Sequence, residues 1–212
     1  MRKRILCVAI ISFIFAVAWP LSALAEGYTK ALSVKVGKYE PTDDIDDLDG
    51  DLYGAISINL YLSPKFALEF GLGKFDAEET FYGFDPFILG SYSEKDEVTV
   101  IPLTINAKGI LPYEWGELYG GAGLGIYLVD INANLNSSFL GTATFSDSDT
   151  VLGFQLIAGI LFNITETVYL GIEGQYILTQ EAQGSDVVYG LPISIEGDVN
   201  GYTFSGLVGF RF

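Results

Sequence analysis

The chain ends in Gly201-Tyr-Thr-Phe-Ser-Gly-Leu-Val-Gly-Phe-Arg-Phe212, where apolar side chains alternate with small or polar ones. In a strand, one face then carries Phe204, Val208, Phe210 and Phe212, and the other carries Thr203, Ser205, Gly209 and Arg211. A terminal aromatic residue places a ring that is to be buried beside a carboxylate that must stay in water. A membrane interface offers both environments within a short distance. The stretch therefore predicts the closing strand of an outer-membrane β-barrel.

The opposite end of the chain has the layout of a secretory signal peptide. Three cationic residues at positions 2–4 precede an apolar run over residues 5–19, and Ala23-Leu24-Ala25 supplies a small-residue cleavage site. The run is shorter than the roughly 20 residues that a membrane-spanning helix needs. We expect cleavage after Ala25, so residues 1–25 are the signal peptide and 26–212 the barrel domain. The alternative is an uncleaved N-terminal anchor.

Composition limits what the mature chain can do. The only cysteine, Cys7, lies in the signal segment, so we expect neither disulfides nor thiol chemistry. Without the three signal cations, eight Lys and Arg residues face 27 Asp and Glu residues. Such an acidic chain is unsuited to nucleic acid, whose binding depends on neutralising phosphates. Half of the residues are hydrophobic, yet no helix-length apolar run follows the signal. A chain of this kind enters a membrane only as a closed sheet.

Seven further stretches alternate like the last one, at about 28–39, 51–62, 65–75, 97–110, 117–130, 150–162 and 167–179. Together they predict an all-β fold, an eight-stranded antiparallel transmembrane β-barrel with up-and-down meander order, and bacterial barrels have even strand numbers. Val98 and Val100 fall out of phase with the apolar positions after them, which predicts a bulge near Pro102. Short turns alternate with long connections near 40–50, 76–96, 131–149 and 180–199. This is typical of periplasmic turns and extracellular loops.

The alternative fold is a soluble ligand-binding barrel of the lipocalin type, which buries its apolar face inside. Here the second face of each strand is too rich in glycine, serine, threonine and charged residues for a soluble core. Aromatic residues near the strand ends are expected to form two interfacial girdles. They are Tyr28, Tyr39, Tyr61, Phe66, Tyr113, Trp115, Phe162 and Phe212.

Four segments carry a family resemblance: Val100-Ile-Pro-Leu-Thr104, Glu117-Leu-Tyr-Gly-Gly-Ala-Gly-Leu-Gly125, Leu170-Gly-Ile-Glu-Gly-Gln-Tyr176 and Gly209-Phe-Arg-Phe212. With them the chain, from about residue 29 to its end, resembles the small outer-membrane β-barrel proteins of the OmpW, OmpX and opacity-protein type. The resemblance implies a Gram-negative outer-membrane location and this fold. Members of the group serve variously as adhesins, stress-linked envelope proteins or narrow conduits for small, often apolar, molecules, so it implies function only broadly.

Catalysis is not expected. The chain contains no histidine, whereas barrel enzymes of similar size, such as lipid A deacylases and omptin-type proteases, use histidine as a general base. We therefore expect a non-enzymatic envelope protein with a structural or surface-interaction role and no cofactor. The alternative is a narrow passive conduit across the outer membrane. A lipid-modifying enzyme and a soluble periplasmic binder rank below both.

Five charged residues fall on the inward face by alternation: Lys35, Glu69, Lys108, Glu173 and Arg211. One interpretation is that they pair across the lumen and plug it, because buried charges must be matched. The other is a polar constriction that selects small solutes. Six inward glycines, at positions 121, 123, 125, 153, 159 and 171, either leave a cavity or make room for Tyr119, Tyr127 and Tyr169.

The densest charge run is Asp43-Asp-Ile-Asp-Asp-Leu-Asp-Gly-Asp51. Its carboxylates offer the oxygen ligands that calcium prefers, and the candidate ligands are Asp44, Asp46, Asp47, Asp49 and Asp51. The run lacks the closing glutamate of an EF-hand loop. The alternatives are a solvated acidic loop, or one that shares divalent cations with lipopolysaccharide phosphates.

The third long connection, residues 132–148, is polar and carries Phe139 and Phe145, which we expect to be exposed. These rings could bind a partner, dip into the membrane or cover the barrel mouth, and any adhesion maps to such loops. The expected partners are outer-membrane lipid and lipopolysaccharide, together with the barrel-assembly machinery, which would engage the strand ending in Phe212. We expect a monomer with extracellular long loops and periplasmic termini.

Overall fold

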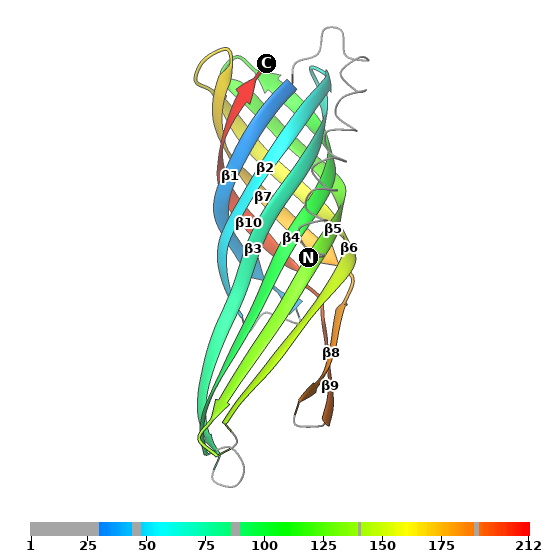
Figure 1. The fold of residues 1–212 in the computed structure, drawn as a ribbon. Coiled ribbons are helices and arrows are strands. Elements are labelled where there is room, and N and C mark those ends of the chain that lie inside the picture. The colour runs from blue at the N-terminus through cyan, green and yellow to red at the C-terminus, as the bar shows by residue number, and fades with distance from the viewer. Residues whose placement is uncertain (1–29, 44–47, 86–89, 140, 189–190) are drawn as a thin grey trace.

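The computed structural model describes residues 30–43, 48–85, 90–139, 141–188 and 191–212. Eight of its strands close into a barrel in the order β1-β10-β7-β6-β5-β4-β3-β2, and every neighbouring pair is antiparallel (Figure 1). They are β1 (Lys30–Pro41), β2 (Asp49–Ser63), β3 (Phe66–Asp85), β4 (Gly90–Tyr113), β5 (Gly116–Ser137), β6 (Gly141–Asn163), β7 (Val168–Thr179) and β10 (Gly201–Arg211). The predicted eight-stranded meander is confirmed. The proposed signal peptide lies outside the described residues.

The barrel closes between its first and last strands. Lys30 N donates to Phe212 O at 2.9 Å and Phe212 N donates to Lys30 O at 2.8 Å. These two hydrogen bonds, between the start of β1 and the end of the chain, lie at the same end of the barrel as the short turns that join β2 to β3, β4 to β5 and β6 to β7 (Figure 1). We refer to this end as the turn end.

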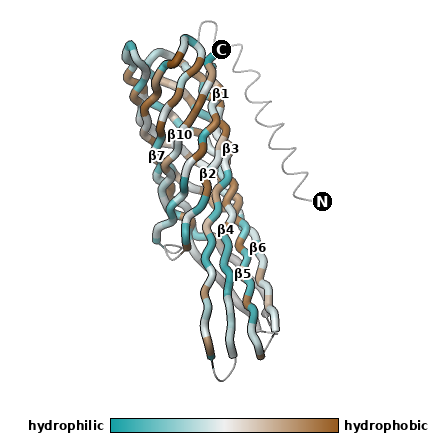
Figure 2. Tube along the Cα trace, turned by 90° about the vertical axis from the view of Figure 1, so that its left-hand side faces the viewer, coloured by the Kyte–Doolittle hydropathy of each residue, from teal (hydrophilic) through white to brown (hydrophobic). Residues whose placement is uncertain are grey.

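Side-chain alternation places polar groups inside the barrel and apolar groups outside. Lys35 is 3% exposed, whereas its neighbours Val34 and Val36 are 44% and 55% exposed. In Figure 2, hydrophobic residues in brown are interspersed with pale and teal ones along the strands of the barrel. A soluble barrel has the opposite polarity, with its apolar side chains inside. The lipocalin-type alternative is therefore wrong.

Strands β3 to β6 continue far beyond the rest of the barrel (Figures 1 and 2). Their pairing runs without interruption to Asp85↔Gly90 on one side and to Ser137↔Gly141 on the other. We call residues 79–85, 90–96, 131–139 and 141–149 the extension. The prediction of loops at 76–96 and 131–149 is wrong, because most of these residues are strand. Alternation of apolar and polar residues identifies a strand only where one face of the sheet is apolar. Here the backbone hydrogen bonds of the sheet continue beyond that region, into residues without the alternation.

The region expected to be a fourth long loop, 180–199, also contains strands. β8 (Ala182–Val188) and β9 (Leu191–Gly197) pair with each other as a separate two-stranded sheet. In the described part of the chain, no helix is long and apolar enough to cross a membrane.

The expected bulge near Pro102 is not present. β4 keeps one register with β3 on either side of Pro102, from Leu72↔Leu103 to Phe75↔Val100, and pairs continuously with β5. Val98 and Val100 are buried inside the barrel. The apolar residues after them on β4 face outward, whereas Val98 and Val100 face an interior that is apolar at this height. The inward face of β4 therefore changes from polar to apolar along the strand, and no bulge is needed.

The interior is layered along the barrel axis. Near the turn end lies a buried apolar cluster made of Ala31, Ala67, Ile110, Tyr119, Leu161, Tyr169 and Leu207. Toward the extension lies a second cluster, whose largest members are Tyr39, Tyr53, Phe75, Tyr127 and Ile177. Between them lies a layer of buried charged and amide side chains. This polar layer is the candidate functional site.

Candidate functional site in the polar layer of the lumen

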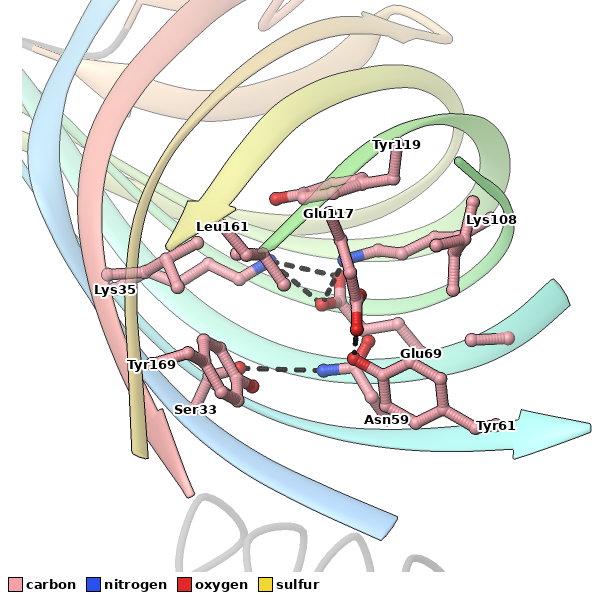
Figure 3. Close-up of a pocket in the computed structure, with 13 residues that line it drawn as sticks. Ser33, Lys35, Asn59, Tyr61, Glu69, Lys108, Glu117, Tyr119, Leu161 and Tyr169 are labelled. Carbon is pink, nitrogen blue, oxygen red and sulfur yellow. Dashed lines mark hydrogen bonds and ion pairs between the residues drawn. The ribbon is translucent and has the colours of Figure 1, made fainter. Parts of the chain in front are cut away.

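Four charged side chains from four strands meet in the lumen (Figure 3 labels Lys35, Glu69 and Lys108). Lys35 comes from β1, Glu69 from β3, Lys108 from β4 and Glu173 from β7, and alternation turns each of them inward. Lys35 Nζ lies 3.0 Å from both Glu69 oxygens and 2.6 Å from Glu173 Oε1. Lys108 Nζ lies 2.6 Å from Glu69 Oε2 and 3.3 Å from Glu173 Oε2. Each lysine therefore contacts both glutamates.

Neutral polar side chains complete the coordination of the two carboxylates. Tyr119 donates its hydroxyl to Glu173 Oε2 at 2.6 Å. Glu69 accepts hydrogen bonds from Ser57 at 3.1 Å and from the Asn106 amide at 3.1 Å. The network then continues from Asn106 to Gln155 and Gln175. Asn106 has the same inward phase as Lys108 on β4, but only this geometry shows that the amides form one network.

The four charged groups form a neutral set of two cations and two anions, and all four are buried. Burying a charge is costly unless an opposite charge and hydrogen bonds compensate it. Here every charged group has at least two partners of opposite sign. Lys108 Nζ also lies 4.4 Å from the centre of the Tyr119 ring, a cation–π contact. The arrangement suits a structural plug that holds opposite walls of the barrel together.

Little space remains around this layer. Two cavities that share Lys35 and Glu69 flank it, and each has a volume of about 10 Å³, room for about one water molecule. Tyrosine rings fill the space beside three of the inward glycines, at positions 125, 153 and 159, whereas backbone atoms, Asn106 or leucine side chains lie beside the other three. A Cβ atom at Gly153 would lie 2.6 Å from the Tyr127 ring, and one at Gly159 would collide with Tyr119.

Arg211 does not belong to this cluster, although it faces the interior as expected. It donates to Glu117 Oε1 at 2.8 Å and to Asn163 Oδ1 at 2.8 Å, at the turn end. Its guanidinium lies 4.7 Å from the centre of the Tyr169 ring. Alternation gives the face of a residue but not its height in the lumen. Glu117 has the same inward phase as Tyr119, so alternation could have found it as a partner.

The expected aromatic girdles are correct in part. Phe66, Tyr113, Trp115, Phe162 and Phe212 are exposed at the turn end, and Trp115 packs between Tyr113 and Phe162 with ring centres 5.2 and 5.5 Å away. The assignment of Tyr39 and Tyr61 to the girdles is wrong, because both side chains point inward. Tyr39 stacks on Phe75, and Tyr61 donates to Glu117 at 3.2 Å. Tyr28 lies outside the described residues.

The candidate calcium ligands are only partly described. Asp44, Asp46 and Asp47 lie outside the described residues, while Asp49 and Asp51 lie exposed on β2. Within the described ranges, no three Asp, Glu or Cys residues gather closely enough to hold a metal ion. Calcium binding by this run stays a prediction. The expected exposure of Phe139 is correct at 62%, but Phe145 is buried, at 5% exposure.

The comparison with protein families decides the broader class. A model described as the outer membrane protein beta-barrel domain matches residues 8–212. The chain belongs to this family. As an outer membrane protein, it places its exposed aliphatic band, which includes Val34 and Val36, against lipid.

Solved structures share the fold of this outer membrane barrel at low sequence identity. The outer membrane protein OprG from Pseudomonas aeruginosa is 12% identical, the match covers 87% of this chain and 96% of that one, and the TM-score is 0.62. A major outer membrane protein from Thermus thermophilus is also 12% identical, with 88% and 100% covered and a TM-score of 0.51. A sequence comparison with curated proteins gave no match.

Proposed function

We propose that this outer membrane barrel is a non-enzymatic surface-interaction protein, with a sealed lumen that serves as a rigid base for the extension. The observation that carries the proposal is the layered interior. Two apolar clusters enclose a charge-matched polar layer, and each of the two cavities beside that layer holds about one water molecule. A rigid scaffold that carries projecting segments is a common arrangement for binding surfaces.

The proposed orientation places the extension outside the cell. Bacterial barrels have short periplasmic turns and longer extracellular segments. The turn end, with both β1 and β10 closing there, would then face the periplasm, and β3 to β6 would project from the outer surface. The terminal strand, ending in Phe212, would be available to the assembly machinery from the periplasmic side.

A narrow conduit is the second candidate. It is favoured by the two cavities that flank Lys35 and Glu69, since they lie on either side of the polar layer. Joining them requires the ion pairs of Lys35 and Lys108 to separate. Four oppositely charged contacts of 2.6–3.3 Å oppose this movement.

A truncation separates the two candidates in cells. Residues 79–96 and 133–145 are each replaced by an Asn-Gly turn, which joins the paired residues Glu78 to Glu97 and Asn132 to Ser146. We expect the shortened barrel to fold and to leave small-solute uptake unchanged, while cell-surface adhesion and aggregation fall. Altered uptake with unaltered adhesion would contradict the surface role and favour the conduit.

A further inference from the structure

The two faces of the extension differ sharply in chemistry. Beyond Asp130 on β5 and its partner Ser148 on β6, the outward positions of these two strands carry amides and hydroxyls: Asn132, Asn134, Asn136, Thr142, Thr144 and Ser146. The inward positions of the same sheet include Glu79, Glu94, Asp96, Asp147 and Asp149. A chain with 27 acidic residues thus keeps an uncharged polar surface over β5 and β6 on the outward side of its extension.

The strand register arranges these outward groups in rows across the sheet. Tyr82 on β3 pairs with Ser93 on β4, Ser93 pairs with Asn136 on β5, and Asn136 pairs with Thr142 on β6. Thr142 donates its hydroxyl to Asn136 Oδ1 at 2.8 Å, which orients the amide. The row therefore presents a ring, a hydroxyl, an amide and a hydroxyl side by side.

Exposed aromatic rings border this uncharged polar face. Tyr82 is 82% exposed and Phe84 is 70% exposed, both at outward positions of β3. The charges in the rows nearer the membrane are partly compensated, because Lys95 Nζ lies 2.8 Å from Glu78 and 3.9 Å from Glu97. Hydroxyl and amide groups hydrogen-bond to sugar hydroxyls, and aromatic rings pack against the C–H faces of sugar rings.

The position of this face in the fold indicates where its ligand comes from. On β5, Asn132 shares its face with Ile126 and Leu128 of the aliphatic outward band, and Asp130 lies between the two parts. The same face thus contacts the acyl chains of the membrane lipids below and the head groups of those lipids above. In an outer membrane that layer is the saccharide of lipopolysaccharide.

We infer that the outward face of the extension, centred on the row Tyr82, Ser93, Asn136 and Thr142, binds uncharged sugar residues of the surrounding lipopolysaccharide. The inference rests on the proposed function, because it requires the extension to lie outside the cell. Its ligand is selected by complementarity of charge. The central row offers no counter-charge to phosphate or sulfate groups, and Lys95 in the neighbouring row is already paired with Glu78. Neutral sugars, by contrast, need only hydrogen bonds and ring contacts.

The test measures binding of the folded mature protein in detergent micelles to uncharged polysaccharides released from smooth lipopolysaccharides by mild acid. Titration calorimetry is performed on the natural sequence and on two variants, Asn136→Asp and Tyr82→Ser, with dextran sulfate as the anionic comparison. Asn163→Asp is the matched control, since it makes the same change at an exposed residue of the turn end. Heat-modifiable gel migration checks that each variant is folded.

We expect saturable binding of an uncharged polysaccharide by the natural sequence and by Asn163→Asp, and binding weaker by about tenfold or more in each face variant. Absence of binding, equal binding by all variants, or preference for dextran sulfate would overturn the inference. So would a stable dimer that only the face variants disrupt. If the barrel does not conduct ions and does not bind the polysaccharide, only this inference is contradicted. If the barrel conducts ions and binds the polysaccharide, only the proposed function is contradicted.

Discussion

Lys35 Nζ lies 2.6 Å from Glu173 Oε1, although β1 and β7 are separated in the barrel by β10. The contact therefore joins two strands that do not pair with each other. Glu173 also contacts Lys108 from β4 and Tyr119 from β5. One side chain thus links three other strands through the interior.

Glu173→Gln should destabilise the barrel strongly. The substitution leaves Lys35 and Lys108 buried with only the Glu69 carboxylate between them. Removing one partner from a buried ion pair costs about 3–5 kcal/mol of unfolding free energy. Urea unfolding in lipid vesicles, followed by tryptophan fluorescence, measures this loss. Glu78→Gln, at an exposed pair on β3, is the control and should cost about 1 kcal/mol or less. Equal losses in the two variants would contradict the interpretation of the polar layer.

Lys35→Met combined with Glu173→Gln should cost less than the sum of the two single substitutions. The double variant retains the neutral Lys108–Glu69 pair at 2.6 Å, so no unmatched charge stays in the lumen. The coupling energy from the double-mutant cycle should be about 1–3 kcal/mol. Additive losses would mean that the two residues stabilise the barrel independently.

Gly153→Val should destabilise the barrel by overpacking the lumen. A Cβ at Gly153 lies 2.6 Å from the Tyr127 ring and 2.9 Å from the Leu178 carbonyl oxygen, and the expected cost is about 1–3 kcal/mol. In the double variant Gly153→Val with Tyr127→Ala, the loss should be smaller than the sum of the losses in the two single variants, because the added methyl groups then meet no ring. Gly54→Ala is the control, because a Cβ there meets nothing within 4 Å. A Gly153→Val barrel as stable as the natural one would show that the ring does not occupy this space.

Acidification should stabilise the extension locally. Burial raises the pKa of the Glu94 carboxyl, with an added contribution from the Asp96 charge, and burial also raises the pKa of Asp96. Protonation is therefore more favourable in the folded extension than in the unfolded chain. The stabilisation is complete below the ordinary carboxyl pKa of about 4 and is lost as pH rises through the raised values.

Hydrogen exchange over residues 92–98, corrected for intrinsic rates, reads out this pH dependence. Protection should increase between about pH 7 and pH 4, and Glu94→Gln with Asp96→Asn should remove the increase. Glu97→Gln, at the adjacent outward position of β4, is the matched control and should retain it. Protection that is independent of pH in the natural sequence would contradict this prediction.

The sequence predicts the barrel wall well because lipid imposes a strict rule on it. Every outward residue there must be apolar, so Val34 and Val36 reveal the phase of β1 and place Lys35 inside. The same phase also places Tyr39 inside, and its assignment to a girdle followed from its position at a strand end alone. Phase along a strand does not fix height in the lumen. Arg211 and Lys108 therefore both face inward but lie in different networks.

The extension could not be predicted in the same way. Above the lipid, neither face of the sheet has to be apolar, and asparagine, which recurs at Asn132, Asn134 and Asn136, is depleted in strands. Its strands exist because each backbone ladder continues from the barrel below. The clustering of Tyr82 with Asn136 depends on the registers of three strand pairs, which no local pattern encodes.

Single-channel recording of the refolded mature protein in a planar bilayer tests the sealed lumen most directly. Folding is first verified by heat-modifiable gel migration, and Lys108→Ala and Glu173→Gln are recorded in parallel. The layered interior predicts that the natural barrel is silent. Discrete openings of the natural barrel, with an ion selectivity that shifts in the two variants, would show a continuous lumen and contradict the account.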